Sequence, residues 1–163
     1  MDYGNKYNGL IDEILYYGER NSDGRWIIPI AVDWDFTLTK CSSWESGEMT
    51  LNEEAFPIME RWIKEYNVGF ILDTMRHDEI LEEPLNILNE KGIKLYGIRK
   101  NPQQKENDVP KVFAIFDIDD RNVGTPKKWE DGCTRPHVDW IKVDTIMSPI
   151  LKHISEQLEK VVL

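Results

Sequence analysis

Polar side chains suited to metal binding and phosphate chemistry come directly after three apolar runs of the sequence. Each run is typical of a strand buried on both faces, because its apolar residues are almost continuous. The carboxyl ends of parallel strands meet at one edge of a sheet, and ligands bind there. We therefore expect three polar clusters to converge: DWDFT at 33–37, DTMR at 73–76 and DIDDR at 117–121.

Several carboxylates at one edge indicate a metal site. Closely spaced carboxylates repel one another, and burying them is costly unless a cation compensates their charge. Mg²⁺ takes oxygen ligands and is typically held by one or two carboxylates together with a substrate phosphate. Beside such an ion, Asp33 could attack phosphorus as a covalent nucleophile. Asp35 could protonate the leaving oxygen and then activate water.

Phosphoryl transfer also needs groups that hold the transferring oxygens as negative charge builds. Thr74 supplies a hydroxyl, and Lys111, at the start of the third predicted strand, is the best cation. Arg76 is either a substrate contact or the partner of a surface salt bridge. Asp73 and Asp117 lie one pleat away from these residues, so we expect them to point to the opposite face and leave them out of the site.

These residues resemble the motifs of the haloacid dehalogenase-like (HAD) phosphohydrolases over about residues 27–145. The first motif of that family, D-x-D-x-T, is similar to DWDFT at 33–37, although Phe36 stands where a glycine is common. The later motifs follow in the family's order: Thr74, Lys111 and the acidic pair Asp119 and Asp120.

The resemblance assigns a role to each matched residue. Asp33 is the nucleophile and a metal ligand, and Asp35 is the acid/base and binds the metal through its backbone carbonyl. Asp119 and Asp120 complete the metal site. Independently of the resemblance, we expect Thr37 and Arg76 to bind substrate, with a surface salt bridge as the alternative for Arg76.

The resemblance also implies an open site. The stretch 118–124 is similar to that of small HAD proteins with little or no cap domain, and only residues 40–56 separate the first motif from the next helix. The implied function is a Mg²⁺-dependent phosphomonoesterase that forms an aspartyl-phosphate. Its substrate is a phosphorylated small molecule or a phosphorylated end of a nucleic acid or protein. The alternative is a HAD-fold binding or regulatory module with little turnover.

Two other classes of protein also place acids over a parallel sheet. Response-regulator receivers combine acids with a threonine and a lysine, but their acidic pair comes on the first strand and their lysine comes last. Metal-dependent glycosyltransferases use a D-x-D motif within a longer chain that has a nucleotide-binding region. Here an acidic pair comes last, at 119–120, and no such region is present in the sequence, so both classes are disfavoured.

Strand and helix patterns alternate along the chain. Helical periodicity predicts helices over 10–17, 55–66 and 79–92 and from about 148 onward, and apolar runs predict strands at 27–35, 68–72, 93–96, 111–118 and 140–143. This alternation predicts an α/β fold, a three-layer doubly wound sandwich with a mainly parallel sheet. We expect a single domain over 1–163, with an N-terminal lead (1–24), a catalytic core (25–147) and a C-terminal helix (148–163).

Composition limits the partners and the compartment. The formal net charge of −10 argues against tight nonspecific nucleic-acid binding, which needs a basic face. No apolar run is long enough to span a membrane, and the first residues lack the features of a signal peptide, so we expect a cytoplasmic protein. Cys41 and Cys133, which are 92 positions apart, are expected to be reduced structural thiols, with a disulfide or a zinc site as the alternatives.

Overall fold

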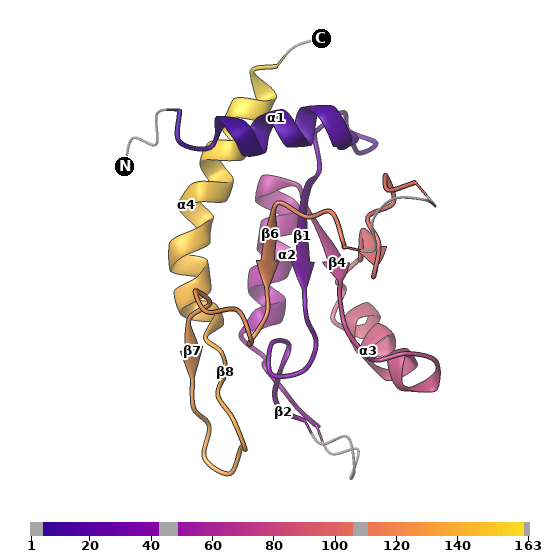
Figure 1. Ribbon diagram of the computed structural model, residues 1–163, viewed down its shortest axis with the longest axis vertical. Helices are drawn as coiled ribbons and strands as arrows, with labels where there is room; N and C mark the ends of the chain where they lie inside the picture. Colours follow the sequence, from indigo (N-terminus) through magenta and orange to yellow (C-terminus); the bar gives the residue numbers. More distant parts are fainter. Residues whose placement is uncertain (1–4, 43–48, 106–110, 162–163) are drawn as a thin grey trace.

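A four-stranded parallel sheet forms the centre of the protein. The computed structural model describes residues 5–42, 49–105 and 111–161. The strands are arranged in the order β5-β4-β1-β6, so the first buried strand of the chain occupies an inner position (Figure 1). Their bounds are β1, Ile28–Val32; β4, Val68–Leu72; β5, Gly97–Ile98; and β6, Phe116–Ile118.

Backbone pairing aligns the carboxyl ends of the three strands that carry the polar clusters. In the parallel register Val32 of β1 lies opposite Leu72 of β4 and Ile118 of β6. The hydrogen bonds continue one residue further, because the N–H of Asp33 donates to the carbonyl of Ile118 at 3.0 Å and the N–H of Asp73 donates to that of Val32 at 2.9 Å. The expected convergence at one sheet edge is therefore confirmed.

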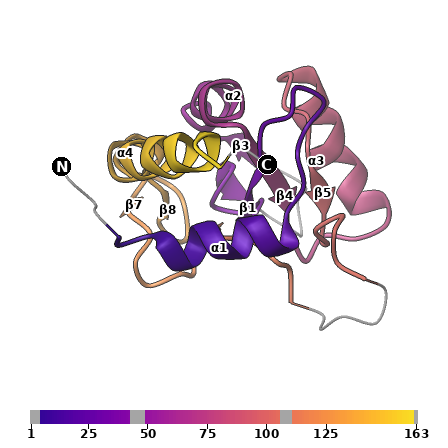
Figure 2. The same cartoon turned by 90° about the horizontal axis from the view of Figure 1, so that it is seen from above.

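Three helices lie on one side of the sheet, as Figure 2 shows: α2 (Ala55–Tyr66), α3 (Glu79–Glu90) and α4 (Trp140–Glu159). On the other side lie α1 (Asn8–Tyr17) and the segment that approaches β6. Within the described residues no helix links β5 to β6. The α/β class and the parallel sheet are confirmed, and the fold is compatible with a Rossmann-like sandwich.

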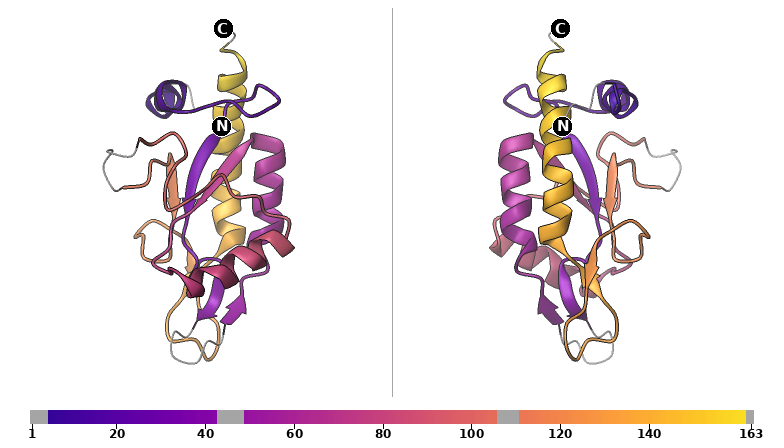
Figure 3. Two further views of the ribbon diagram at one scale, coloured as in Figure 1. Left: turned by 90° about the vertical axis from the view of Figure 1, so that its right-hand side faces the viewer. Right: turned by 90° about the vertical axis from the view of Figure 1, so that its left-hand side faces the viewer.

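The helices pack on the sheet through large apolar and aromatic side chains. All five residues of β1 and of β4 are buried, as are Trp62 of α2 and Trp140 of α4. Figure 3 shows α2 and α4 side by side, and the indole N–H of Trp62 donates to Asp144 of α4 at 2.8 Å. None of the helices in the described ranges combines the length and apolarity that crossing a bilayer requires.

Two hairpins extend beyond the carboxyl ends of the sheet, while α1 crosses its opposite end (Figure 1). The first pairs β2 (Thr39–Ser42) with β3 (Met49–Leu51), and the second pairs β7 (Lys127–Lys128) with β8 (His137–Val138). A disulfide between Cys41 and Cys133 joins the two hairpins, with the Cα atoms 5.5 Å apart. The prediction of two reduced thiols is therefore wrong. Residues far apart in the sequence meet here only because both hairpins leave the same edge.

Several predicted boundaries also differ. The last helix begins at Trp140 and not near Ser148, so the strand predicted at 140–143 is helical. The reason is a cap, because the Asp139 side chain accepts a hydrogen bond from the N–H of Lys142, and α4 continues through Pro149. The strands predicted at 93–96 and 111–118 are two or three residues long and lie at 97–98 and 116–118.

Candidate active site

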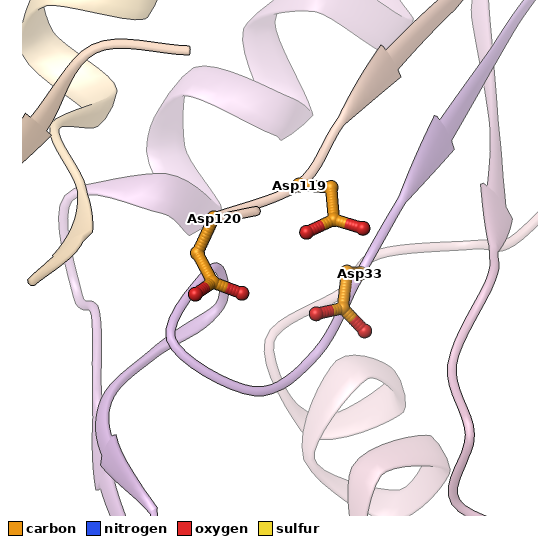
Figure 4. Close-up of side chains that lie close together, drawn as sticks. All are labelled: Asp33, Asp119 and Asp120. Atoms are coloured by element: carbon orange, nitrogen blue, oxygen red, sulfur yellow. The ribbon is translucent and has the colours of Figure 1, made fainter. Parts of the chain in front are cut away.

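Three carboxylates face one another at the carboxyl edge of the sheet (Figure 4). They belong to Asp33, which follows β1, and to Asp119 and Asp120, which follow β6. One oxygen from each lies within 4.8 Å of the others. The structure thus brings together the three metal ligands that are predicted to bind through their carboxylates. The fourth predicted ligand, Asp35, is expected to bind through its backbone carbonyl, which this cluster does not test.

The cluster carries negative charge that its own residues do not compensate. The pKa of Asp33 is raised from 3.8 to about 7, mainly by burial and also by the charges of Asp119, Asp35 and Asp120, against a hydrogen bond from the Trp34 backbone. Burial also raises the pKa of Asp120. Burial and neighbouring negative charge both disfavour the ionised carboxylates, and a bound cation would offset both effects. The donor set of carboxylate oxygens fits Mg²⁺.

Thr37 has a structural role that the sequence did not predict. Its side chain is fully buried, and its hydroxyl oxygen accepts a hydrogen bond from the backbone N–H of Asp120 at 3.1 Å. Its carbonyl accepts from the indole N–H of Trp140 and from the side-chain amide of Asn52. Thr37 therefore fixes the β1–β2 turn against the acidic pair. It does not line the pocket that Asp33 lines, so the structure does not support it as a substrate contact.

Asp35 forms a buried ion pair with Arg76. The Arg76 guanidinium donates from Nε to Oδ2 of Asp35 at 3.0 Å and from Nη2 to Oδ1 at 2.8 Å. Both side chains are about 10% exposed. The Asp35 carboxylate is thus held as a bidentate acceptor and stays outside the three-carboxylate cluster. Of the two alternatives left open for Arg76, the structure gives an ion pair, and this pair is buried within the site and not on the surface.

A pocket of about 230 Å³ opens beside Asp33, lined by Asp33, Asp35, Asp73, Thr74, Met75, Asp119, Arg121 and Arg135. Thr74 is buried on its wall, as expected. Asp73 also lines it, which corrects the expectation that this side chain points to the other face. The parallel register pairs Leu72 with Val32, and the pairing continues to the next residue. Asp73 therefore lies beside Asp33 and faces the same pocket.

Lys111 is not brought into this pocket. It is exposed and lies five residues before β6, whose carboxyl end carries the acidic pair. The pKa of Asp117 is raised mainly by burial, with the Lys111 charge acting against that rise. Asp117 lines a different groove with residues of α4. Sequence order alone suggested Lys111, but a residue before a strand belongs to the edge opposite the carboxyl ends.

Arg135 is a cation of the pocket that sequence reasoning missed. It lies between β7 and β8, and its guanidinium is 4.0 Å from the ring centre of Phe36. Its Nε and Nη2 atoms lie 3.4 Å from the carboxylate oxygens of Asp120. Residues 129–136 have no periodicity or motif, so no pattern in the sequence pointed to this arginine.

Phe36 has a left-handed backbone, with φ of 56°. Glycine adopts this conformation at no steric cost, which explains why glycine is common at this position of the resembled motif. The turn is stabilised here by a hydrogen bond from the Phe36 N–H to the hydroxyl of Thr39 at 2.9 Å.

Comparison with known proteins gives one structural relative and no family. No protein-family model and no curated protein matches the chain. A solved structure of a conserved protein from Bacteroides thetaiotaomicron is similar, with a TM-score of 0.55 and 21% sequence identity. The match covers 76% of this chain and 92% of that protein. At this identity the likeness shows a shared fold.

Proposed function

We propose that the protein is a Mg²⁺-dependent phosphomonoester hydrolase of the HAD type, with Asp33 as the nucleophile. The observation that carries this proposal is the cluster of Asp33, Asp119 and Asp120 at the carboxyl edge of a parallel sheet, in which Asp33 has a raised pKa of about 7. Acidic side chains in this arrangement are typical of metal-dependent phosphoryl transfer. The resemblance to HAD motifs and the parallel sheet of an α/β fold support the same assignment.

The ion would be held by Asp33, Asp119 and Asp120. When bound, Mg²⁺ supplies positive charge that offsets the carboxylates and the incoming phosphate. In the first step an Asp33 oxygen bonds to phosphorus, the bond from phosphorus to the substrate oxygen breaks, and Asp35 gives a proton to that leaving oxygen. In the second step water gives a proton to Asp35 and its oxygen attacks the phosphorus of the aspartyl-phosphate, which breaks the bond to Asp33 and releases inorganic phosphate.

Other pocket residues would orient the phosphoryl group. Thr74 offers its hydroxyl on the wall next to Asp33. The rim includes Asp73, Met75 and Arg121, all of which are exposed, so a phosphate presented at the end of a larger molecule has access. We therefore keep both substrate classes, a small phosphate ester and the phosphorylated terminus of a nucleic acid or protein.

The ion pair between Asp35 and Arg76 favours a second candidate. Asp35 must exchange a proton to act as acid/base, but both of its carboxylate oxygens accept hydrogen bonds from Arg76. For turnover this pair has to open so that the Asp35 carboxylate can reach the leaving group. If it stays closed, the same site binds Mg²⁺ and phosphate with little hydrolysis, as expected of a HAD-fold binding or regulatory module.

Hydrolysis of an aryl phosphate, with and without Mg²⁺, separates the two candidates. A phosphatase releases phosphate only with Mg²⁺ and loses this activity in Asp33→Asn. Asp12→Asn is the matched control, because Asp12 is an exposed carboxylate on α1 at the opposite end of the sheet. Activity that survives Asp33→Asn contradicts the proposed mechanism. Mg²⁺ binding without turnover on a broad panel of phosphate esters favours the binding module.

A further inference from the structure

Arg135 lies beside the carboxylate cluster but is weakly engaged by it. Its closest contacts to Asp120 are 3.4 Å, from Nε to Oδ2 and from Nη2 to Oδ1. Charge-assisted hydrogen bonds between nitrogen and oxygen usually measure about 2.7–2.9 Å. The other arginine near the cluster, Arg76, meets Asp35 at 2.8 and 3.0 Å. Arg135 therefore lies near the Asp120 carboxylate but forms only long contacts with it.

The Arg135 guanidinium also has an unused donor. Its Nε is shielded from solvent and makes no hydrogen bond among the described residues, because its contact with Asp120 at 3.4 Å is an ion-pair contact without hydrogen-bond geometry. A buried donor without a partner is costly, and a guanidinium presents five N–H groups in a fixed fork that matches phosphate oxygens. Arg135 lines the same pocket as Asp33 and Thr74, so an anion bound beside those two residues would also lie next to the guanidinium.

The chain holds Arg135 in place from both sides. Two residues before it, Cys133 is joined by the disulfide to Cys41 of β2. Three residues after it, the N–H of Val138 donates to the carbonyl of Phe36 at 2.8 Å. The segment that carries Arg135 is thus anchored at both ends to the turn and strand that follow Asp33.

Phe36 supplies the surface on which Arg135 rests. Its ring lies beneath the guanidinium, 4.0 Å away, although its φ of 56° is a conformation that glycine adopts more easily. A glycine would relieve the backbone but would offer no ring for stacking. Stacking of Arg135 on the ring therefore explains why a phenylalanine stands at position 36 in place of the common glycine.

We propose that Arg135 is the phosphate-binding cation of this site, presented from the loop between β7 and β8 and stacked on Phe36. This inference rests on the phosphate chemistry proposed above but not on efficient turnover. It assigns to Arg135 the task that sequence order suggested for Lys111. In the absence of phosphate, the guanidinium of Arg135 contacts Asp120. When phosphate binds, the guanidinium donates hydrogen bonds to the phosphate oxygens.

This role predicts effects of opposite sign on two ligands. In Arg135→Ala, inorganic phosphate should bind about 10- to 100-fold more weakly in the presence of Mg²⁺, as expected when a hydrogen bond to a charged group is lost. Mg²⁺ alone should bind several-fold more tightly, because a nearby positive charge is removed and Asp120 is released. A purely structural role would weaken both. Titration calorimetry with Mg²⁺, and with phosphate at saturating Mg²⁺, measures both affinities.

Four further variants complete the test. Arg135→Lys keeps the charge without the planar fork and should bind phosphate with intermediate affinity, and Phe36→Gly should weaken phosphate binding a few-fold through loss of the ring. Arg20→Ala is the matched control, because Arg20 also stacks on an aromatic ring, that of Trp26, outside the pocket. Lys111→Ala should leave phosphate binding unchanged.

The proposal is overturned if Arg135→Ala binds phosphate like the natural protein, if it loses affinity for both ligands together, or if Lys111→Ala has the larger effect. It is also overturned if the natural protein with Mg²⁺ binds no phosphate. Failure of the hydrolase proposal is a separate outcome, since a protein that hydrolyses no phosphate ester can still bind phosphate through Arg135. Conversely, Mg²⁺-dependent hydrolysis that is unaffected in Arg135→Ala leaves the hydrolase proposal intact and removes this one.

Discussion

Replacing Asp33 by asparagine should stabilise the metal-free protein, and more so at high pH. The pKa of Asp33 is about 7 in the folded protein, against 3.8 for an ordinary aspartate. A carboxyl whose pKa is raised by folding binds its proton more tightly in the folded state, so ionising it costs folding free energy. The cost begins near the unfolded pKa of 3.8 and is complete above about pH 7, where the shift corresponds to about 4 kcal/mol.

Asparagine is similar in size and carries no charge, so it avoids this cost. Between pH 5 and pH 7 the unfolded Asp33 is ionised while the folded one is protonated. Each pH unit in this window therefore lowers the stability of the natural protein by about 1.4 kcal/mol relative to Asp33→Asn. The difference in free energy of unfolding between Asp33→Asn and the natural protein should therefore grow by about 2.5 kcal/mol from pH 5 to pH 8.

Urea denaturation at pH 5 and pH 8 with a chelator present measures this difference. Asp12→Asn controls for the loss of one exposed carboxylate and should show no comparable growth between the two pH values. If the effect of Asp33→Asn on the free energy of unfolding is the same at both pH values, Asp33 does not carry buried, uncompensated charge, and the argument for a cation at this cluster is refuted.

Three further predictions concern the same edge of the sheet. Mg²⁺ affinity should fall about tenfold per pH unit below pH 7, because a proton on Asp33 competes with the ion; an affinity independent of pH in calorimetric titrations would contradict this. Cys41→Ser should lower the free energy of unfolding by about 2–4 kcal/mol in non-reducing buffer and weaken phosphate binding, and reductant should reproduce both effects in the natural protein but not in the variant. Thr37→Val should lower the free energy of unfolding by about 1–3 kcal/mol and weaken Mg²⁺ binding, since it leaves the buried N–H of Asp120 unpaired. Thr37→Ser keeps the hydroxyl, so its stability in denaturation and its Mg²⁺ affinity in metal titrations should match those of the natural protein.

Much of the fold was predictable because its strands are buried on both faces. Continuous apolar runs identified β1 and β4 with nearly correct bounds, and helical periodicity gave α2 and α1. Prediction failed where tertiary contacts replace local pattern. β6 keeps only three residues of an eight-residue apolar run, and α4 begins eight residues before its predicted start, at a cap formed by Asp139.

The candidate site was predictable in its carboxylates and not in its cations. Asp33, Asp119 and Asp120 follow strands whose ends must align in a parallel sheet, so their convergence follows from sequence position. Cations reach the site from loops, and a loop's path depends on what it packs against. Arg135 enters from the second hairpin, and Lys111 lies outside the pocket before β6.

The sequence by itself determined the α/β class, a mainly parallel sheet and the meeting of acidic residues at one edge, because these depend on local hydrophobic pattern and strand direction. Only the tertiary structure decided that Cys41 and Cys133 form a disulfide, that Arg76 neutralises Asp35 and that Arg135 stacks on Phe36 beside Asp120. Each of these contacts joins residues 40 or more positions apart. Their distance in space is set by the packing of loops, which no short-range pattern in the chain encodes.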